Sequence, residues 1–294
     1  MVLFAALTVL FPETMQQQWA AGPWAIVLTC VACNLVFCFG EYLFHRYLLH
    51  MEAVRFLGRL CTSHLAHHKL TPVGFDDRHR TVRSGYAIKA EEDDHAATFA
   101  PWALLAFFGF WTPLFAVITF SFPRFPILIS GYTSLAIAHF LYETIHVAHH
   151  LPYDSWWKRR IEGGLTAPLW RKLYGFHQAH HANYRCNMNL AGFFGVPLAD
   201  IAFNTYKQPE TLLLDGAPAT KALARDLTPS PRWPISWFDS MALKRRRRMK
   251  DEDNDRRAMA RGHVTGRPAR SLRLDDQLPL GHIECDPREP VQRQ

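Results

Sequence analysis

The sequence lacks the cysteine arrangements that hold small secreted domains or structural zinc ions together. Its six cysteines are scattered, and the single C-x-x-C (Cys30 and Cys33) falls inside an apolar run, where small side chains usually pack. The chain also has no ferredoxin cysteine cluster and no G-x-G-x-x-G fingerprint of a dinucleotide-binding fold. No built-in electron carrier is therefore expected.

Three long stretches of the chain contain almost no charged residues. Residues 98–122 contain no charged side chain, and residues 24–44 and 126–145 contain one each. A helix needs about 20 apolar residues to cross the roughly 30 Å hydrocarbon core of a bilayer. The three runs predict three membrane-spanning helices, with the alternative that Pro113 splits the middle run into a short hairpin.

Lysine and arginine are absent from residues 1–23, and the connection between the second and third runs contains only Arg124. Residues 45–97 carry eight of them, and most of the others follow the third run. The positive-inside rule therefore places residues 45–97 and 146–294 in the cytoplasm. The net charge of +7 follows from this asymmetry, so no nucleic-acid partner is expected. The basic run Lys244–Lys250 is expected near anionic lipid head groups.

Histidine, by contrast, is abundant, and 14 of the 16 histidines lie between residues 45 and 181. The pattern H-x-x-H-H occurs three times, and a pair with four intervening residues precedes it. Residues three and four apart share a face of a helix, so the rings of each motif should point the same way. All four segments fall on the expected cytoplasmic side. The predicted metal ligands are His45, His50, His64, His67, His68, His146, His150, His177, His180 and His181.

Ten imidazoles on one side of a membrane can hold two metal ions with four or five ligands each. Nitrogen donors suit iron, zinc and copper, and the absence of thiolate argues against a structural zinc site. A carboxylate-bridged di-iron bundle would need paired Glu-x-x-His motifs, whereas this chain has one, at Glu143. Glu41 and Glu143 are expected to hydrogen-bond a ligand ring or to reach the membrane interface, and His149 to be a ligand or a ring beside one.

The remaining histidines are expected to have ordinary roles. His139 precedes the third box by two turns and is predicted to be buried and hydrogen-bonded. His79 and His95 are predicted to lie in loops, and His263 and His282 in the C-terminal tail.

The composition divides the chain into two parts. Residues 1–203 are predicted to form an all-α, membrane-embedded domain, an integral membrane helical bundle that contains the three spans and all four histidine segments. Residues 204–294 are predicted to be a polar, basic, largely irregular cytoplasmic tail, irregular above all from residue 216 onward. The first eleven residues lack the positive segment of a secretory signal and predict an interfacial or partly inserted helix.

The histidine segments resemble those of the membrane fatty acid hydroxylase/sterol desaturase superfamily, and most of all its fatty acid hydroxylase branch. They read "EYLFHRYLLH", "HLAHHK" followed by "FD", "LYETIHVAHH" and "HQAHH", and the resemblance covers roughly residues 38–195. It implies that residues 1–203 are a catalytic domain, an all-α integral membrane helical bundle with a cytosolic helical cap that holds a histidine-box dimetal site. It also implies two iron ions (with zinc as a substitute in purified material) and O₂-dependent C–H oxidation. The chain departs from this family in two ways: it lacks a fused haem-binding electron-transfer domain, and its segment around "DSWWKRRIEGG" is longer.

The resulting functional expectation is hydroxylation of a fatty acyl chain that enters from the bilayer, with O₂ as co-substrate and electrons from a separate donor protein. A sterol or carotenoid hydroxylase or desaturase of the same superfamily is the alternative. A histidine-rich metal transporter is a remote third reading, because a transporter should place its ligands near mid-membrane or on both faces. Nothing in the sequence indicates an oligomeric state.

Overall fold

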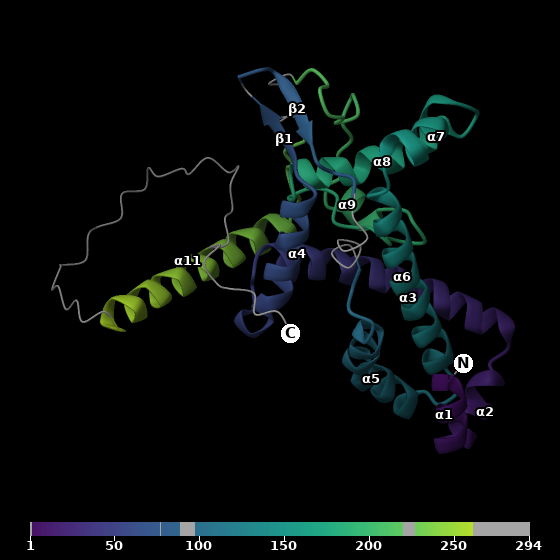
Figure 1. Ribbon diagram of the computed structural model, residues 1–294. Helices are drawn as coiled ribbons and strands as arrows, with labels where there is room; N and C mark the ends of the chain where they lie inside the picture. The colour runs from purple at the N-terminus through teal and green to yellow at the C-terminus, as the bar shows by residue number, and fades with distance from the viewer. Residues whose placement is uncertain (1, 77, 89–97, 220–226, 261–294) are drawn as a thin grey trace.

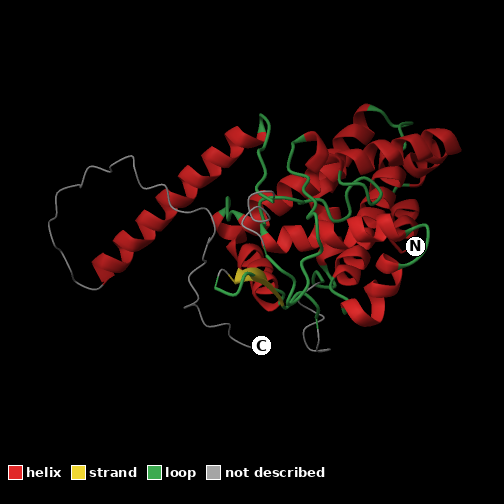
Figure 2. Ribbon diagram, turned by 90° about the horizontal axis from the view of Figure 1, so that it is seen from above, coloured by secondary structure: helices red, strands yellow, loops and turns green. Residues whose placement is uncertain are grey.

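The computed structural model describes residues 2–76, 78–88, 98–219 and 227–260, and these are mostly helical (Figures 1 and 2). The helices are α1 (Val2–Leu10), α2 (Pro12–Trp19), α3 (Pro23–Phe44), the π-helix η1 (His45–His50), the 3₁₀ turn η2 (Arg55–Leu57), α4 (Gly58–Leu70), α5 (Ala103–Ser121), α6 (Ile127–His149), the π-helix η4 (Tyr153–Trp157), α7 (Lys158–Glu162), α8 (Ala167–Ala182), α9 (Leu198–Ala202) and α11 (Ile235–Ala260). The short helix predicted at the N-terminus corresponds to α1.

The apolar helices pack around α6, which contacts α2, α3 and α5. The side chain of Gln18 joins α2 to α5 and α6. Its Oε1 atom accepts from the backbone N–H of Leu128 on α6 at 2.9 Å, and its Nε2 atom donates to the hydroxyl of Thr119 on α5 at 3.3 Å. Helices α5 and α6 approach closely at Gly131, because a Cβ there would meet the ring of Phe115 at 2.7 Å. These contacts fix the N-terminal half of α6 against α2 and α5.

Among the described residues, two helices are long and apolar enough to cross a membrane, by length and composition: the continuous helix Pro23–His50 and Ala103–Ser121. The second exposes large apolar side chains such as Phe110 and Phe120, which are 75% and 84% exposed. Pro113 lies inside this helix, which runs unbroken, so the alternative of a short hairpin is not seen. The third predicted run forms α6, but its first two turns are buried in the bundle and it is not among the candidate spans.

A short antiparallel hairpin interrupts the helical architecture that the sequence predicted. Strands β1 (Val73–Asp76) and β2 (Thr81–Ser84) pair with Val73 opposite Ser84. The carboxylate of Asp76 accepts from the backbone N–H groups of Arg78 and His79, which closes the turn. His79 is exposed in this turn, as predicted for a loop histidine.

The C-terminal part contains a long helix where the sequence predicted irregular chain. Helix α11 has 26 residues and extends away from the rest of the molecule (Figure 1). Its arginine, lysine, methionine and alanine residues favour helix, and opposite charges four apart, such as Arg247 and Asp251, add support. Leu213 and Leu227, which precede this helix, are also buried, in the core that includes Val73 and Val82 of the hairpin. His95, His263 and His282 lie outside the described residues.

Candidate metal centre

The first histidine pair depends on a change of helix type at the end of α3. In an α-helix, residues five apart point about 140° away from each other. From His45 to His50 the chain is instead a π-helix, whose hydrogen bonds join residues five apart and so place such residues above one another. The two rings are stacked, with centroids 4.9 Å apart and planes at 22°. The H-x₄-H spacing thus matches the local backbone.

The other predicted ligands lie in the last turns of three helices. His64, His67 and His68 are on α4, the third box ends α6, and the fourth box ends α8. In each case ordinary α-helical geometry puts residues three or four apart on the same face. Four separate segments therefore present their rings to one region between α3, α4, α6 and α8.

Nine of the ten predicted ligands form two groups, and within each group all the ligating atoms lie within 4.8 Å of one another. One group, called group A here, consists of His67, His146, His150, His177 and His181. The other, group B, consists of His45, His50, His64 and His180. The tenth, His68, lies beside group B, with its Nε2 atom 3.2 Å from that of His64. Each group can hold a metal ion.

The spacing of the nitrogens fits shared coordination. In group B the Nε2 atoms of His45 and His50 lie 3.0 and 3.1 Å from that of His64. In group A those of His150 and His181 each lie 3.1 Å from that of His177. Two nitrogens bound to one ion at about 2.0–2.1 Å would be about 2.9 Å apart at a right angle and about 3.4 Å apart at a tetrahedral angle. The observed spacings fall in this interval.

Backbone carbonyls orient four of the rings. A carbonyl can only accept a hydrogen bond, so a ring whose Nδ1 faces one must carry its proton there and leave the Nε2 lone pair free. The four Nδ1–H groups donate over 2.6–3.0 Å to the carbonyls of Met188 (from His45), Tyr86 (from His150), Cys186 (from His180) and Thr71 (from His181). Two of these rings belong to each group, and their Nε2 atoms face the other members.

Burial keeps the rings neutral, which is the state that binds a metal ion. Loss of solvation lowers the pKa of His67 to about 2 and that of His150 to about 3. For His67 the neighbouring His150 lowers the pKa further, and for His150 the Tyr86 carbonyl offsets part of the lowering. Burial and neighbouring rings also lower the pKa of His177 and His181 well below its ordinary value. At neutral pH these nitrogens therefore offer lone pairs.

The residues expected to support the ligand rings have other partners. The carboxylate of Glu41 accepts from the backbone N–H groups of residues 190, 191 and 192 at 2.6–2.9 Å, so it holds a loop and not a ring. Glu143 accepts from the backbone N–H of Phe99 at 3.0 Å. His149 donates its Nε2–H to the carbonyl of Leu173 at 2.9 Å and belongs to neither group. Of the two roles expected for Glu41 and Glu143, acceptance of a hydrogen bond from a ligand ring is therefore not seen among the described residues, and the contact with the membrane interface stays a prediction.

His139 is half-buried between the rings of Phe99 and Phe107, away from both groups. Its Nδ1 atom has no hydrogen-bond partner among the described residues, so the predicted hydrogen-bonded role is not seen for that atom.

One buried ion pair next to group B was not predicted. Arg46, within the π-helix, forms a bidentate ion pair with the carboxylate of Asp239 on α11 through its Nε and Nη2 atoms. Its Nη1 atom donates to the carbonyl of Arg185 at 2.8 Å. Tyr47 donates to the same carboxylate at 3.0 Å. The pair is separated by 193 residues, and no motif links its members. It ties the π-helix to α11 and to the chain that follows α8.

No protein-family model, curated protein or solved structure matches this chain. We therefore infer its function from the geometry of the two histidine groups and from the apolar helices beside them.

Proposed function

We propose that this chain is an integral membrane, non-haem di-iron oxidoreductase that uses O₂ to oxidise a C–H bond of a lipid, as a fatty acyl hydroxylase. The observation that carries this proposal is the convergence of nine buried or half-buried histidines from four chain segments into two adjacent groups. The groups lie at the ends of apolar helices, one of which, Pro23–His50, ends on a group B histidine. A metal pair held there would face both membrane and cytoplasm.

The donor set supports redox-active metal ions. All ligating atoms are imidazole nitrogens, which suit iron, and none is a thiolate. Two iron ions, when bound, would supply the oxidising power for an unactivated C–H bond, which amino-acid side chains do not have. In this proposal O₂ is the co-substrate and zinc is a substitute ion in purified material.

The protein's own contribution is orientation and exclusion of water. Carbonyl-bound rings such as His45 and His180 are fully buried and have their Nε2 atoms fixed, which reduces the rearrangement needed to bind metal. His64 and His68 are only half-buried, so group B has a side that is less closed than the rest of the site. A lipid chain and O₂ would approach the metals from this side.

The membrane setting follows the distribution of charge. We assign α3 and α5 as spans that face lipid, and α6, which packs against both, as a third crossing that returns the chain to the starting side. Residues 45–97 and 146–294 then lie together on the cytoplasmic side. A metal transporter should carry ligands at mid-membrane or on both faces. Here α3 and α6 both carry their histidine boxes at their C-terminal ends, which favours the enzyme.

The test begins with metal content and two ligand variants. Purified protein should contain about two iron ions per chain, and His64→Ala (group B) and His181→Ala (group A) should each lose metal and abolish product. His79→Gln is the matched control, because that ring is exposed in the hairpin turn. Full activity in either ligand variant would refute the assignment.

Lipid profiling of cells with and without the gene then identifies the reaction. A gain of one oxygen on an acyl chain is expected, and the same gain on a sterol or carotenoid would establish the alternative substrate. A loss of two hydrogens would indicate a desaturase. Absence of bound iron together with metal flux in liposomes would overturn the proposal in favour of a transporter.

A further inference from the structure

An aromatic path connects group A to the surface of the cap. His177, a group A ring, lies 4.8 Å from His149 between ring centroids. The rings of His149 and Trp157 are nearly parallel, with planes at 11° and centroids 6.2 Å apart. The centroid of the Trp157 ring lies 4.7 Å from that of Trp156 and 6.1 Å from that of Trp170. Trp157 is fully buried, whereas the last two tryptophans are half-buried. Adjacent rings therefore extend from the metal site to solvent.

A second, hydrogen-bonded connection follows the same direction. The indole Nε1–H of Trp157 donates to the carbonyl of Ala148 at 3.1 Å, and Ala148 is bonded directly to His149 in the chain. Electron transfer slows exponentially with the gap between donor and acceptor, so continuous contacts of this kind make a favourable route. Packing alone explains why Trp157 is buried, but it does not explain why the ring cluster ends at a charged surface.

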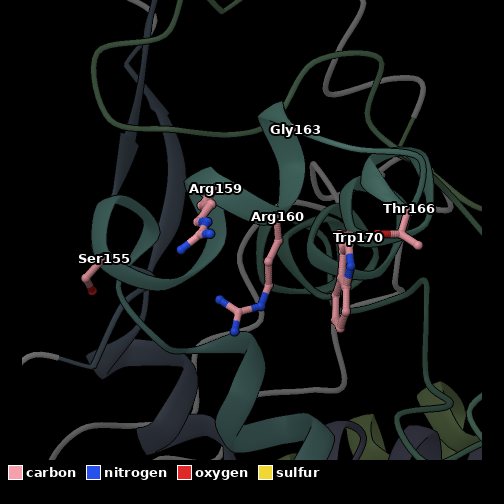
Figure 3. A pocket seen from close by; sticks show the side chains of 6 residues that line it. All are labelled: Ser155, Arg159, Arg160, Gly163, Thr166 and Trp170. Carbon is pink, nitrogen blue, oxygen red and sulfur yellow. The ribbon is translucent and has the colours of Figure 1, made fainter.

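The path ends at a hollow of about 400 Å³ between α7 and α8, shown in Figure 3. Its lining residues are Ser155, Arg159, Arg160, Gly163, Thr166 and Trp170. The guanidinium of Arg160 lies over the ring of Trp156, 3.8 Å from its centroid. Figure 3 shows the Arg160 and Trp170 side chains extending next to each other.

The surroundings of this hollow have the composition of a protein interface. Five basic residues and two acidic ones occur between residues 154 and 172. Leu165 and Leu169 are 101% and 65% exposed beside them. Tryptophan and arginine are the residues most enriched at interface hot spots, and an excess of one charge speeds association with an oppositely charged partner. Helix α7 lies at the end of the molecule opposite α1 and α2, away from the apolar helices (Figure 1).

We propose that the face formed by residues 155–170 is the docking surface of an acidic one-electron carrier protein, and that Trp157 and His149 lead its electrons to His177. This inference rests on the proposed function, which requires an external donor. Hydroxylation converts R–H, O₂, two electrons and two protons into R–OH and water. Two successive dockings of a one-electron carrier supply the electrons, and water supplies the protons.

The test uses the full-length, iron-loaded protein in detergent and an acidic [2Fe–2S] ferredoxin as the probe. The docking variant Lys158→Glu/Arg159→Glu reverses two exposed charges, and Arg247→Glu/Arg248→Glu on α11 reverses two others as a matched control. We expect the docking variant to bind the ferredoxin about tenfold more weakly, in the metal-free protein as well, and the control to be unchanged. Reduction of the iron by reduced ferredoxin, followed by stopped-flow absorbance, should slow in parallel.

A second pair of variants tests the ring path. Trp157→Leu should leave ferredoxin binding intact but slow reduction at saturating ferredoxin about tenfold or more, and Trp157→Phe should restore most of the rate. Dithionite, a small reductant that needs no docking surface, should reduce every variant that keeps its iron at the wild-type rate.

Wild-type binding and reduction rates in the docking variant would overturn the docking surface, as would an acidic carrier that fails to bind the wild-type protein. Equal rates in Trp157→Leu and wild type would overturn the path. Both results leave the proposed function intact if dithionite still reduces two irons per chain. Protein without reducible iron would instead overturn the proposed function, and the inference with it.

Discussion

At the scale of single residues, the Nδ1 atom of a ligand histidine, which binds a carbonyl, matters as much as the Nε2 atom that faces the metal group. His45, His150, His180 and His181 each use Nδ1 to bind a carbonyl, so the free lone pair lies on Nε2. The spacing of the histidines in the sequence predicts which rings share a helix face. The carbonyls that orient them lie outside the motifs, at residues 71, 86, 186 and 188, and three of the four are 64 to 143 residues away from the ring that they bind. No side-chain pattern marks a backbone acceptor.

The buried rings predict how the stability of the metal-free protein depends on pH. In the unfolded chain His67 and His150 titrate near the ordinary pKa of about 6.5, whereas burial lowers their pKa to about 2 and about 3 in the folded protein. Below pH 6.5 the unfolded chain therefore binds protons that the folded chain does not. The free energy of unfolding should fall by up to about 1.4 kcal/mol per ring for each pH unit below 6.5, and stay level above about pH 7.5.

Thermal unfolding of metal-depleted protein in detergent, compared at pH 7.5 and 5.5, measures this effect. His67→Gln should show a smaller change in melting temperature between the two pH values than wild type does, because one of the titrating rings is gone. A wild-type melting temperature that is the same at both pH values would contradict the expectation.

The pair of Arg46 and Asp239 makes a sharper prediction about a single contact. Asp239→Asn leaves a buried guanidinium without its countercharge, and breaking a buried ion pair costs about 3–5 kcal/mol. Because Arg46 lies in the π-helix beside His45, the variant should also lose metal from group B. Metal analysis and a melting curve of the purified variant check both effects.

Tyr47→Phe is the matched control, since it removes one hydrogen bond to the same carboxylate and keeps the ion pair. It should cost only about 0.5–1.5 kcal/mol and keep both metals. If both variants lost metal equally, the hydroxyl of Tyr47, and not the ion pair, would be the group that holds the π-helix.

At the scale of elements, the π-helix is what makes the first histidine pair usable. A π-helix is equivalent to one extra residue in an α-helix, so deleting Leu48 should restore an α-helix in which the two histidines are four apart and still share a face. Inserting an alanine after Leu48 should instead turn one ring away. We expect the deletion variant to keep both metal ions and the insertion variant to lose the group B ion, as measured by metal content. The reverse result would show that the π-helix has another purpose.

The length of the nearly uncharged runs predicted α3, α5 and α6, and the histidine spacings, which match an α-helix, predicted α4 and α8. Neither signal predicted the π-helix, since a period of 3.6 residues gives no signal for one extra residue. The hairpin of β1 and β2 was missed because each strand has only four residues. Helix α11 was missed because its charged sequence has no apolar stripe, although its residues favour helix and Asp239 fixes its first turns.

At the scale of the whole molecule, the proposed orientation in the membrane is open to a direct test. Ser155 on the cap and Arg124 in the α5–α6 connection are both exposed, and the proposal assigns them to opposite sides of the membrane. A membrane-impermeant maleimide applied from the cytoplasmic side should label Ser155→Cys and not Arg124→Cys, with wild-type protein as the background control. Labelling of both variants from the same side would contradict the proposed arrangement of the spans.

The use of main-chain carbonyls to orient ligands has a consequence for how such a protein can change over generations. Every residue type has the same main-chain carbonyl. The residues at positions 86 and 188 can therefore be substituted while the rings of His150 and His45 stay in place. Tyr86 and Met188 are both buried, and the ring of Tyr86 lies against that of His150. Under the proposed function, substitutions at these two positions change the space around the site, and with it the preferred substrate, while every metal ligand stays in place.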